Sequence, residues 1–418
     1  MFQRFSHSVL IILLFIDGEA LLASEPISLK EAFQKAKQHE QGKALLGIER
    51  EKTSQLEAKD SQATAPFLPD LNASYSIQRQ DDSVIANDDS KTAKLTLTQN
   101  VFNGFKDISS KKSARLNAGA QKLREEYRSS TLFMDVALSY FNLAKAQAEM
   151  TTLDETDKLI KMRYREVSDR IRIGRSRATE KMALDAQISL FNAQREKAKF
   201  DLVIAEENFQ LWTGVGQGAV LTDADSKIRP PLPSFTEVSN SLEKRKDIVA
   251  LKQETESFAE AVKVARAEIF PSVDLQGNYY LLRPEAQEKV KWDVGVSLTV
   301  PLFQGGEHRG KIWEAASRRQ EKQLAYENTL LLSRNEIRVS YLQAQSLFAQ
   351  ASEYQSAVES SDKNYKALVK EYSLGLSSNL DVLQALNIYL DNYRSRNRVH
   401  FEYLAALWKL RILVDQTE

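Results

Sequence analysis

The 418-residue sequence contains no cysteine and only four histidines. The first absence excludes disulfide frameworks, thiolate metal sites, cysteine nucleophiles and attachment of lipid to an N-terminal cysteine. Beyond the first residues, the histidines His39, His308 and His400 stand far apart, each without a neighbouring metal-ligand partner. Phosphate-loop, GxSxG and HExxH motifs are also missing. We therefore expect no metal site, no cofactor and no catalysis.

Breaker residues and net charge are also scarce. Nine prolines and fifteen glycines favour long uninterrupted elements over many short ones. Lys and Arg together number 57, as do Asp and Glu, so no excess positive charge points to a nucleic-acid partner. No run beyond the first residues reaches the roughly eighteen consecutive apolar residues of a membrane helix, so an inner-membrane protein is not expected.

Residues 1–24 have the pattern of a signal peptide. Arg4 provides a positive start, and Val9–Ile16 reads VLIILLFI, an apolar core too short to cross a bilayer. Small residues near Ala23 and Ser24 suit a cleavage site. The alternative is a buried N-terminal strand. Export is the interpretation that the pattern favours.

The remaining sequence contains a tandem duplication. Matching landmarks recur 201 positions apart (303 − 102, 341 − 140 and 375 − 174): Phe102 and Phe303, Tyr140 and Tyr341, and Gly174 and Gly375. This period is too long for a solenoid repeat and indicates two large structural halves. We predict a first repeat at 25–212, a linker at 213–235, a second repeat at 236–413 and a tail at 414–418.

Each repeat begins with a polar helical stretch and continues into a pair of amphipathic strands, at 70–101 and 272–300. In the first strand Leu71, Ala73 and Tyr75 alternate with polar residues. Alternation over about ten residues suits a tilted strand with one face in lipid and one in water. An ordinary half-buried sheet is the alternative. Duplicated hairpins in an exported chain favour the membrane, and because four strands cannot close a barrel alone, we expect several chains to pool them.

After each strand pair the periodicity becomes helical. Two long outgoing helices and two shorter returning helices are predicted at 108–172, 178–212, 308–373 and 379–412. Small and apolar residues at three- and four-residue spacing are typical of coiled-coil seams. A glycine follows each long helix, at Gly174 and Gly375, and supplies the left-handed residue that ends it. The predicted fold is thus mainly helical with a membrane β-barrel.

With these features the chain resembles the TolC family of outer membrane efflux proteins. The likeness is carried by FLPDLNASY and IFPSVDLQGNYY, by LTQNVFNGF and LTVPLFQGG, and by the turn GLSSNLDVLQA, and it covers roughly residues 26–413. The resemblance implies a homotrimer with a shared twelve-stranded barrel in the outer membrane of a Gram-negative cell. It also implies an α-helical barrel through the periplasm that docks with an adaptor and an inner-membrane pump or ABC exporter. Such ducts are passive, and they carry drugs, metal ions or polypeptides.

The resemblance also implies site residues. Those matching the family's narrow periplasmic entrance are Asp381, Tyr372, Glu180 and Thr179. Those at the hairpin tips, where the adaptor docks, are Gly174, Arg175, Ser176, Gly375, Leu376 and Ser377. Gln384 replaces a second entrance aspartate of many relatives, and Ser377 stands where relatives have a latching arginine, for which Arg175 and Arg177 are candidate substitutes. For Glu180 and Asp381 the alternative is a solvated helix cap.

The paired strand endings have a physical explanation in a membrane protein. Each marks the place where a lipid-facing strand leaves the bilayer and continues as a helix. Proline is tolerated where the ladder ends, apolar side chains suit the interface, and glycine lets the backbone turn. A simple strand–turn–helix junction is the alternative. The junction residues are Phe102, Gly104, Pro301, Phe303 and Gly305.

A rival interpretation is a periplasmic coiled-coil structural or adaptor protein without a channel. It accounts for the signal peptide and the helices. It does not account for four duplicated amphipathic strands, so the exit duct of a tripartite efflux or type I secretion system is the preferred hypothesis.

Overall fold

A computed structural model describes residues 26–79, 89–174, 176–222, 230–283 and 289–414. The predicted signal peptide therefore lies outside the described residues. So do Arg175, part of the predicted linker and most of the predicted tail.

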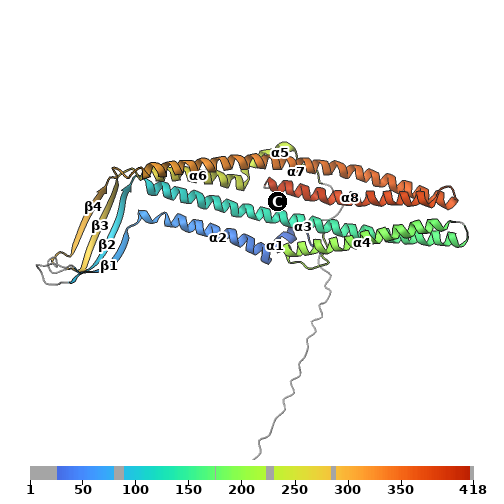
Figure 1. Ribbon diagram of the computed structural model, residues 1–418, viewed down its shortest axis with the longest axis horizontal. Coiled ribbons are helices and arrows are strands. Elements are labelled where there is room, and N and C mark those ends of the chain that lie inside the picture. The colour runs from blue at the N-terminus through green and yellow to red at the C-terminus, as the bar shows by residue number, and fades with distance from the viewer. Residues whose placement is uncertain (1–25, 80–88, 175, 223–229, 284–288, 415–418) are drawn as a thin grey trace, which may run out of the picture.

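The chain forms eight α-helices and four β-strands within these residues. In chain order they are α1 (Leu29–Gln38), α2 (Glu40–Gln62), β1 (Asp70–Arg79), β2 (Asp89–Asn103), α3 (Lys106–Arg172), α4 (Ala178–Thr213), α5 (Phe235–Asn240), α6 (Lys246–Ala267), β3 (Ser272–Leu282), β4 (Trp292–Thr299), α7 (Glu307–Leu374) and α8 (Asn379–Leu413). Figure 1 shows the strands at one end of an elongated molecule and the α3–α4 and α7–α8 turns at the other.

The two longest helices set the dimensions of the molecule. Helix α3 has 67 residues and α7 has 68, which at about 1.5 Å per residue makes each roughly 100 Å long. Helix α3 packs against α2, α4, α6 and α8, whereas α7 packs mainly against α6 and α8. Every helix in the described part of the chain falls short of the length and apolar character that crossing a membrane requires.

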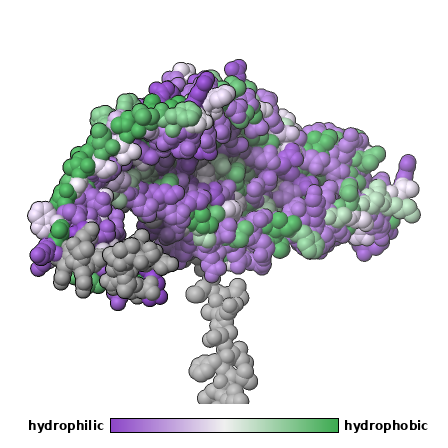
Figure 2. All heavy atoms as spheres, turned by 60° about the vertical axis from the view of Figure 1, so that its left-hand side comes forward, coloured by the Kyte–Doolittle hydropathy of each residue, from purple (hydrophilic) through white to green (hydrophobic). Residues whose placement is uncertain are grey.

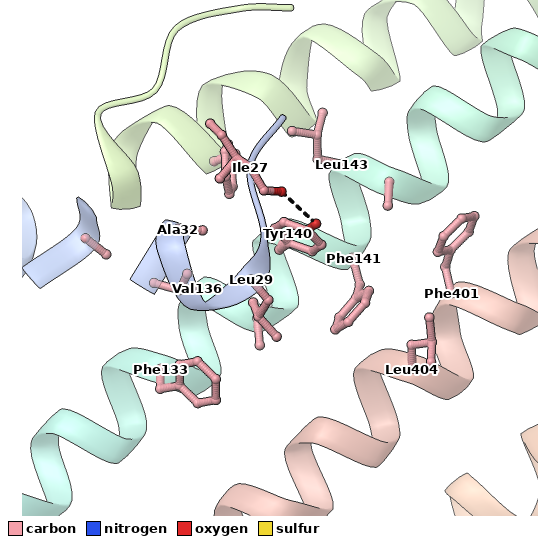
Figure 3. Packing of buried hydrophobic residues seen from close by; sticks show 14 of the residues in the cluster. Ile27, Leu29, Ala32, Phe133, Val136, Tyr140, Phe141, Leu143, Phe401 and Leu404 are labelled. Carbon is pink, nitrogen blue, oxygen red and sulfur yellow. Dashed lines mark hydrogen bonds between the residues drawn. The ribbon is translucent and has the colours of Figure 1, made fainter. Parts of the chain in front are cut away.

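The largest core lies where α1, α3, α4 and α8 meet, midway along the rod. Tyr140 and Phe141 of α3 are buried there with Phe401 of α8 (Figure 3). The Tyr140 hydroxyl donates a hydrogen bond of 3.0 Å to the carbonyl of Ile27, which ties the segment before α1 to α3. A buried tyrosine needs such a partner for its hydroxyl.

The strands form one antiparallel sheet in the order β1-β2-β3-β4. One row of its register joins Leu71, Leu97, Gly277 and Val294. Within the chain β1 and β4 each pair on one side only, so the sheet has two open edges. The predicted four-stranded, mainly helical fold is confirmed.

The two faces of the sheet differ in polarity, as the alternation predicts. Exposed hydrophobic side chains cover one face, and Figure 2 shows them as a band over the curved outer side of the sheet: Leu71, Tyr75, Ile77, Leu97, Leu275, Tyr279, Leu281, Trp292, Val294, Val296 and Leu298. On the other face Thr96 donates to Asn278 at 2.8 Å, and Asn278 donates to Asp293 at 2.8 Å. Lipid on one side and water on the other suit this division.

The register departs from strict alternation near the end of β2. A shift between Asn100 and Phe102 leaves Val101 as an extra residue and places Phe102 opposite Val273. Such a β-bulge bends the strand that carries it. Phe102, predicted as a junction residue, thus lies inside β2, and the turn into α3 begins at Gly104.

Both strand-to-helix junctions use two consecutive left-handed residues. Gly104 and Phe105 have φ of 67° each, and Gly305 and Gly306, their equivalents 201 positions later, have φ of 57° and 88°. Phe105 is the one non-glycine residue with positive φ in the described ranges. Pro301 and Phe303 lie between β4 and the second glycine pair, and Phe303 is almost fully exposed.

Replacing Gly104 by alanine should destabilise the first junction. A Cβ there would lie 2.7 Å from the Ala267 carbonyl oxygen and 2.7 Å from the Phe270 Cβ, at a φ that favours glycine. Left-handed strain alone costs about 1–2 kcal/mol. We expect a lower midpoint of thermal unfolding by circular dichroism.

The control is Gly47→Ala within α2, where an added Cβ meets nothing within 4 Å. Alanine there should leave the midpoint unchanged or raise it, because glycine is unfavourable inside a helix by roughly 1 kcal/mol. Equal midpoints for the two variants would contradict the tight packing at Gly104.

Candidate functional site

The end of the molecule farthest from the sheet consists of two helical turns. Gly174 and Gly375 adopt φ of 71° and 80°, and a Cβ added at either would meet nothing within 4 Å. The N–H of Gly375 donates to the Tyr372 carbonyl at 3.1 Å, and the N–H of Leu376 donates to the Glu371 backbone carbonyl at 2.9 Å. Both turns are therefore closed by their own backbone and face outward.

A tyrosine between two arginines joins the two hairpins just behind these turns. The Tyr372 ring on α7 has the guanidinium carbons of Arg163 and Arg170, both on α3, at 4.1 Å and 4.2 Å from its centroid. Cation–π contacts contribute about 0.5–2 kcal/mol each, more when desolvated. Arg170 also donates to the Tyr372 carbonyl at 3.2 Å. Helix α3 thereby holds the last turn of α7.

Two carboxylates complete this cluster. Glu166 accepts from Arg163 at 2.7 Å and lies 3.5 Å from Arg170. Glu180, at the start of α4, accepts from the Ser176 hydroxyl at 2.7 Å and from the Tyr372 hydroxyl at 3.5 Å, which is a long and weak contact. The structure thus brings together the predicted residues Tyr372, Glu180 and Ser176.

Burial of the ring and repulsion from the Glu180 carboxylate raise the pKa of Tyr372. Its hydroxyl is therefore protonated at neutral pH and acts as the donor toward Glu180.

Arg163 is the residue of this cluster that sequence reasoning missed. Its side chain is only 3% exposed, and its Nε donates to the Asn379 amide oxygen at 3.1 Å. A buried charge is stable only when paired and hydrogen-bonded. Charged residues at 163, 166 and 170 share one helical face, but in sequence such a run is indistinguishable from a solvated surface. Only the position of α7 and α8 shows that this face is covered.

Asp381 has a different role within the single chain. Its carboxylate accepts from the Ser378 amide at 2.9 Å and from the Ser378 hydroxyl at 2.6 Å, which forms a capping box at the start of α8. These bonds from the Ser378 side chain and backbone lower the pKa of Asp381. Its side chain is exposed, as is that of Thr179.

The remaining tip residues close the turns. The Ser377 hydroxyl donates to the Leu368 carbonyl at 3.2 Å, so this serine ties the turn back onto α7. Arg177 precedes α4 as its N-cap residue. Across the described ranges, no three His, Cys, Asp or Glu residues are grouped to hold a metal ion.

Comparison with known proteins supports one family. The model of the family described as "Outer membrane efflux protein" matches residues 51–217 and 238–413. Outer membrane protein TolC of Escherichia coli is 21% identical over 374 residues, covering 83% of this chain and 74% of that protein. Alkaline protease secretion protein AprF of Pseudomonas aeruginosa is 23% identical over 342 residues, covering 77% and 69%. A crystal structure of CusC superimposes with a TM-score of 0.81 at 20% identity, covering 94% and 93%.

Replacing Arg163 by methionine should loosen the hairpin ends. The change leaves Glu166, Asn379 and the Tyr372 ring without their shared partner. Losing a charged hydrogen bond costs about 2 kcal/mol, so backbone amides of residues 370–383 should exchange hydrogen roughly 30-fold faster. Mass-spectrometric hydrogen exchange measures this directly.

Lys161→Met on the same helix is the matched control. Lys161 is exposed and pairs with Asp157 one turn earlier, and such surface pairs contribute little. Unchanged exchange in Arg163→Met, or equal changes in both variants, would show that Arg163 does not hold the hairpins together.

Proposed function

The chain belongs to the outer membrane efflux protein family, and we propose that three copies form a passive exit duct through the outer membrane. In this proposal the duct receives cargo from a periplasmic adaptor and an inner-membrane pump or exporter. The duct then serves a tripartite efflux or type I secretion system. The chain lies in the outer membrane with most of its helices in the periplasm.

One observation carries the proposal: the sheet has an apolar outer face and two open edges. Unpaired backbone N–H and C=O groups in hydrocarbon cost several kcal/mol each, so open edges do not persist in lipid. Pairing the free edge of β4 with the free edge of β1 from another copy removes both. Three copies of a four-stranded chain would close a twelve-stranded barrel.

The helices support the same assembly. The roughly 100 Å length of α3 and α7 suits a conduit that crosses the periplasm. The hairpin turns lie at the end far from the sheet (Figure 1). They would form the entrance, where Tyr372 and Glu180 would hold the hairpins together, with the exposed Thr179 beside them, and Asp381 would face the pore. The exposed turns at Gly174 and Gly375 would contact the adaptor.

Purification tests this proposal. The protein extracted from outer membranes should require detergent, have the mass of three chains by light scattering, and conduct ions across a planar lipid bilayer. A single chain that stays dissolved without detergent and conducts nothing would instead support a periplasmic coiled-coil structural or adaptor protein.

Asp381→Asn should lower the preference of the channel for cations over anions toward unity. Three copies would place three carboxylates around one axis, and such rings attract cations and raise one another's pKa. Reversal potentials in a salt gradient measure the preference.

Ser378→Ala is the control, because it removes a hydrogen-bond partner of Asp381 but keeps the charge. It should retain cation preference at neutral pH. Equal selectivity of Asp381→Asn and the unaltered protein would exclude Asp381 from the pore lining.

A further inference from the structure

The duplication provides an internal template for contacts between copies. The first half of the chain packs on the second half through α3, which contacts α6 and α8. The equivalent of α3 in the second half is α7, and the equivalents of α6 and α8 in the first half are α2 and α4. If copies close into a ring, α7 of one copy should therefore meet α2 and α4 of the next.

Equivalent positions follow from element starts and landmarks. Helix α3 begins at Lys106 and α7 at Glu307 (307 − 106 = 201), and α4 and α8 begin 201 positions apart (379 − 178). Helices α2 and α6 end 205 positions apart, at Gln62 and Ala267 (267 − 62). Each residue pair that α3 forms with the second half of its own copy therefore predicts an equivalent pair between α7 of one copy and the first half of the next copy.

The first informative contact lies in the core. Phe141 of α3 points toward Phe401 and Leu404 of α8 (Figure 3). Phe141 and Phe401 are each only 3% exposed. This is where the first half is sealed against the second.

The equivalents of these side chains are uncovered in a single chain. Leu342 corresponds to Phe141 and is 53% exposed, and Phe200 corresponds to Phe401 and is 68% exposed. Val203, the equivalent of Leu404, is exposed too. Leu342 lies 35 residues into α7 (342 − 307), or about 50 Å from the sheet. At that distance membrane lipid cannot cover it.

The second contact lies near the sheet. Lys112 of α3 forms an ion pair of 2.7 Å with Glu260 of α6. Their equivalents are Trp313 of α7 (112 + 201), which is 75% exposed, and Gln55 of α2 (260 − 205), which is exposed as well. A large apolar side chain and a neutral polar one thus take the place of a charged pair.

We propose that α7 of one copy packs against α2 and α4 of the next copy, with Leu342 on Phe200 and Trp313 over Gln55. We call this contact between copies the seam. It rests on the proposed trimer, and the residues just named hold the trimer together there. The seam continues the proposed pairing of β4 with β1 of the next copy, because α7 follows β4 and α2 precedes β1 in the chain. The exposed apolar side chains Trp313 and Leu342 of α7 are therefore covered by a second copy of the chain.

Cysteine cross-linking tests the contact between Leu342 and Phe200, and the natural chain has no cysteine to interfere. The double variant Leu342→Cys, Phe200→Cys, in membranes treated with diamide, should give disulfide-linked dimers and trimers on non-reducing gels. Reductant should return them to single chains. Each single variant should remain a single chain, because one thiol per copy has no partner at the seam.

Transplanting the internal ion pair tests the second contact. Trp313→Lys and Gln55→Glu should each lower the temperature at which detergent-solubilised trimers dissociate. The double variant should recover most of the loss, because it recreates between copies the pair that Lys112 and Glu260 make within one copy. Additive losses without recovery would mean that Trp313 meets lipid instead.

The outcomes separate this seam from the proposed function. Trimers that conduct ions but show neither cross-links nor recovery would overturn the seam and leave the duct standing. An unaltered protein that stays a single chain would overturn both. Cross-linked trimers together with recovery in the charge-pair variant would establish the seam.

Discussion

The structure depends on one constraint, which is that a sheet edge in lipid must be paired. The chain supplies one apolar sheet surface and two unpaired edges, so in lipid it would be stable only as part of a closed barrel. Each edge strand adjoins a helix in the chain, β1 after α2 and β4 before α7, and α7 carries exposed apolar side chains such as Trp313 and Leu342. In the proposed trimer, pairing the strands would therefore bring α7 of one copy against α2 of the next.

The junctions carry this constraint from the sheet into the helices. Two consecutive left-handed residues redirect the chain at each junction, and the first of these is glycine in both halves. At the second position the halves differ, with Phe105 in one and Gly306 in the other. Left-handed phenylalanine is strained, yet its ring packs on Phe102 at 5.3 Å, an edge-to-face contact that offsets part of the strain. The backbone path is thus the same although the residues differ.

The fold was predictable because its signals are periodic and repeated. Alternation of apolar and polar residues in Leu71–Ile77, long proline-free helices and a 201-residue repeat each point to the same architecture. The bulge at Val101 was not predictable, because only Phe102 and Asn103 follow it in β2, too few residues to reveal the change of phase that one extra residue causes in a pattern of period two. At the hairpin ends, Gly174 and Gly375 were visible as turn glycines. The buried Arg163 was not, because its burial depends on α7 and α8, more than 200 residues away.

The two kinds of contact have different consequences for movement. Within a copy, the hairpin ends are joined by a buried arginine that has specific partners in Tyr372 and Asn379. Such directional contacts lose most of their energy with a small displacement, because distance and angle are both constrained. In the proposed trimer, side chains such as Leu342 and Phe200 would meet between copies, and burial of their apolar surface is non-directional and tolerates sliding. The two hairpins of one copy should therefore move as a unit, and a change in the width of the entrance should occur at the boundary between copies.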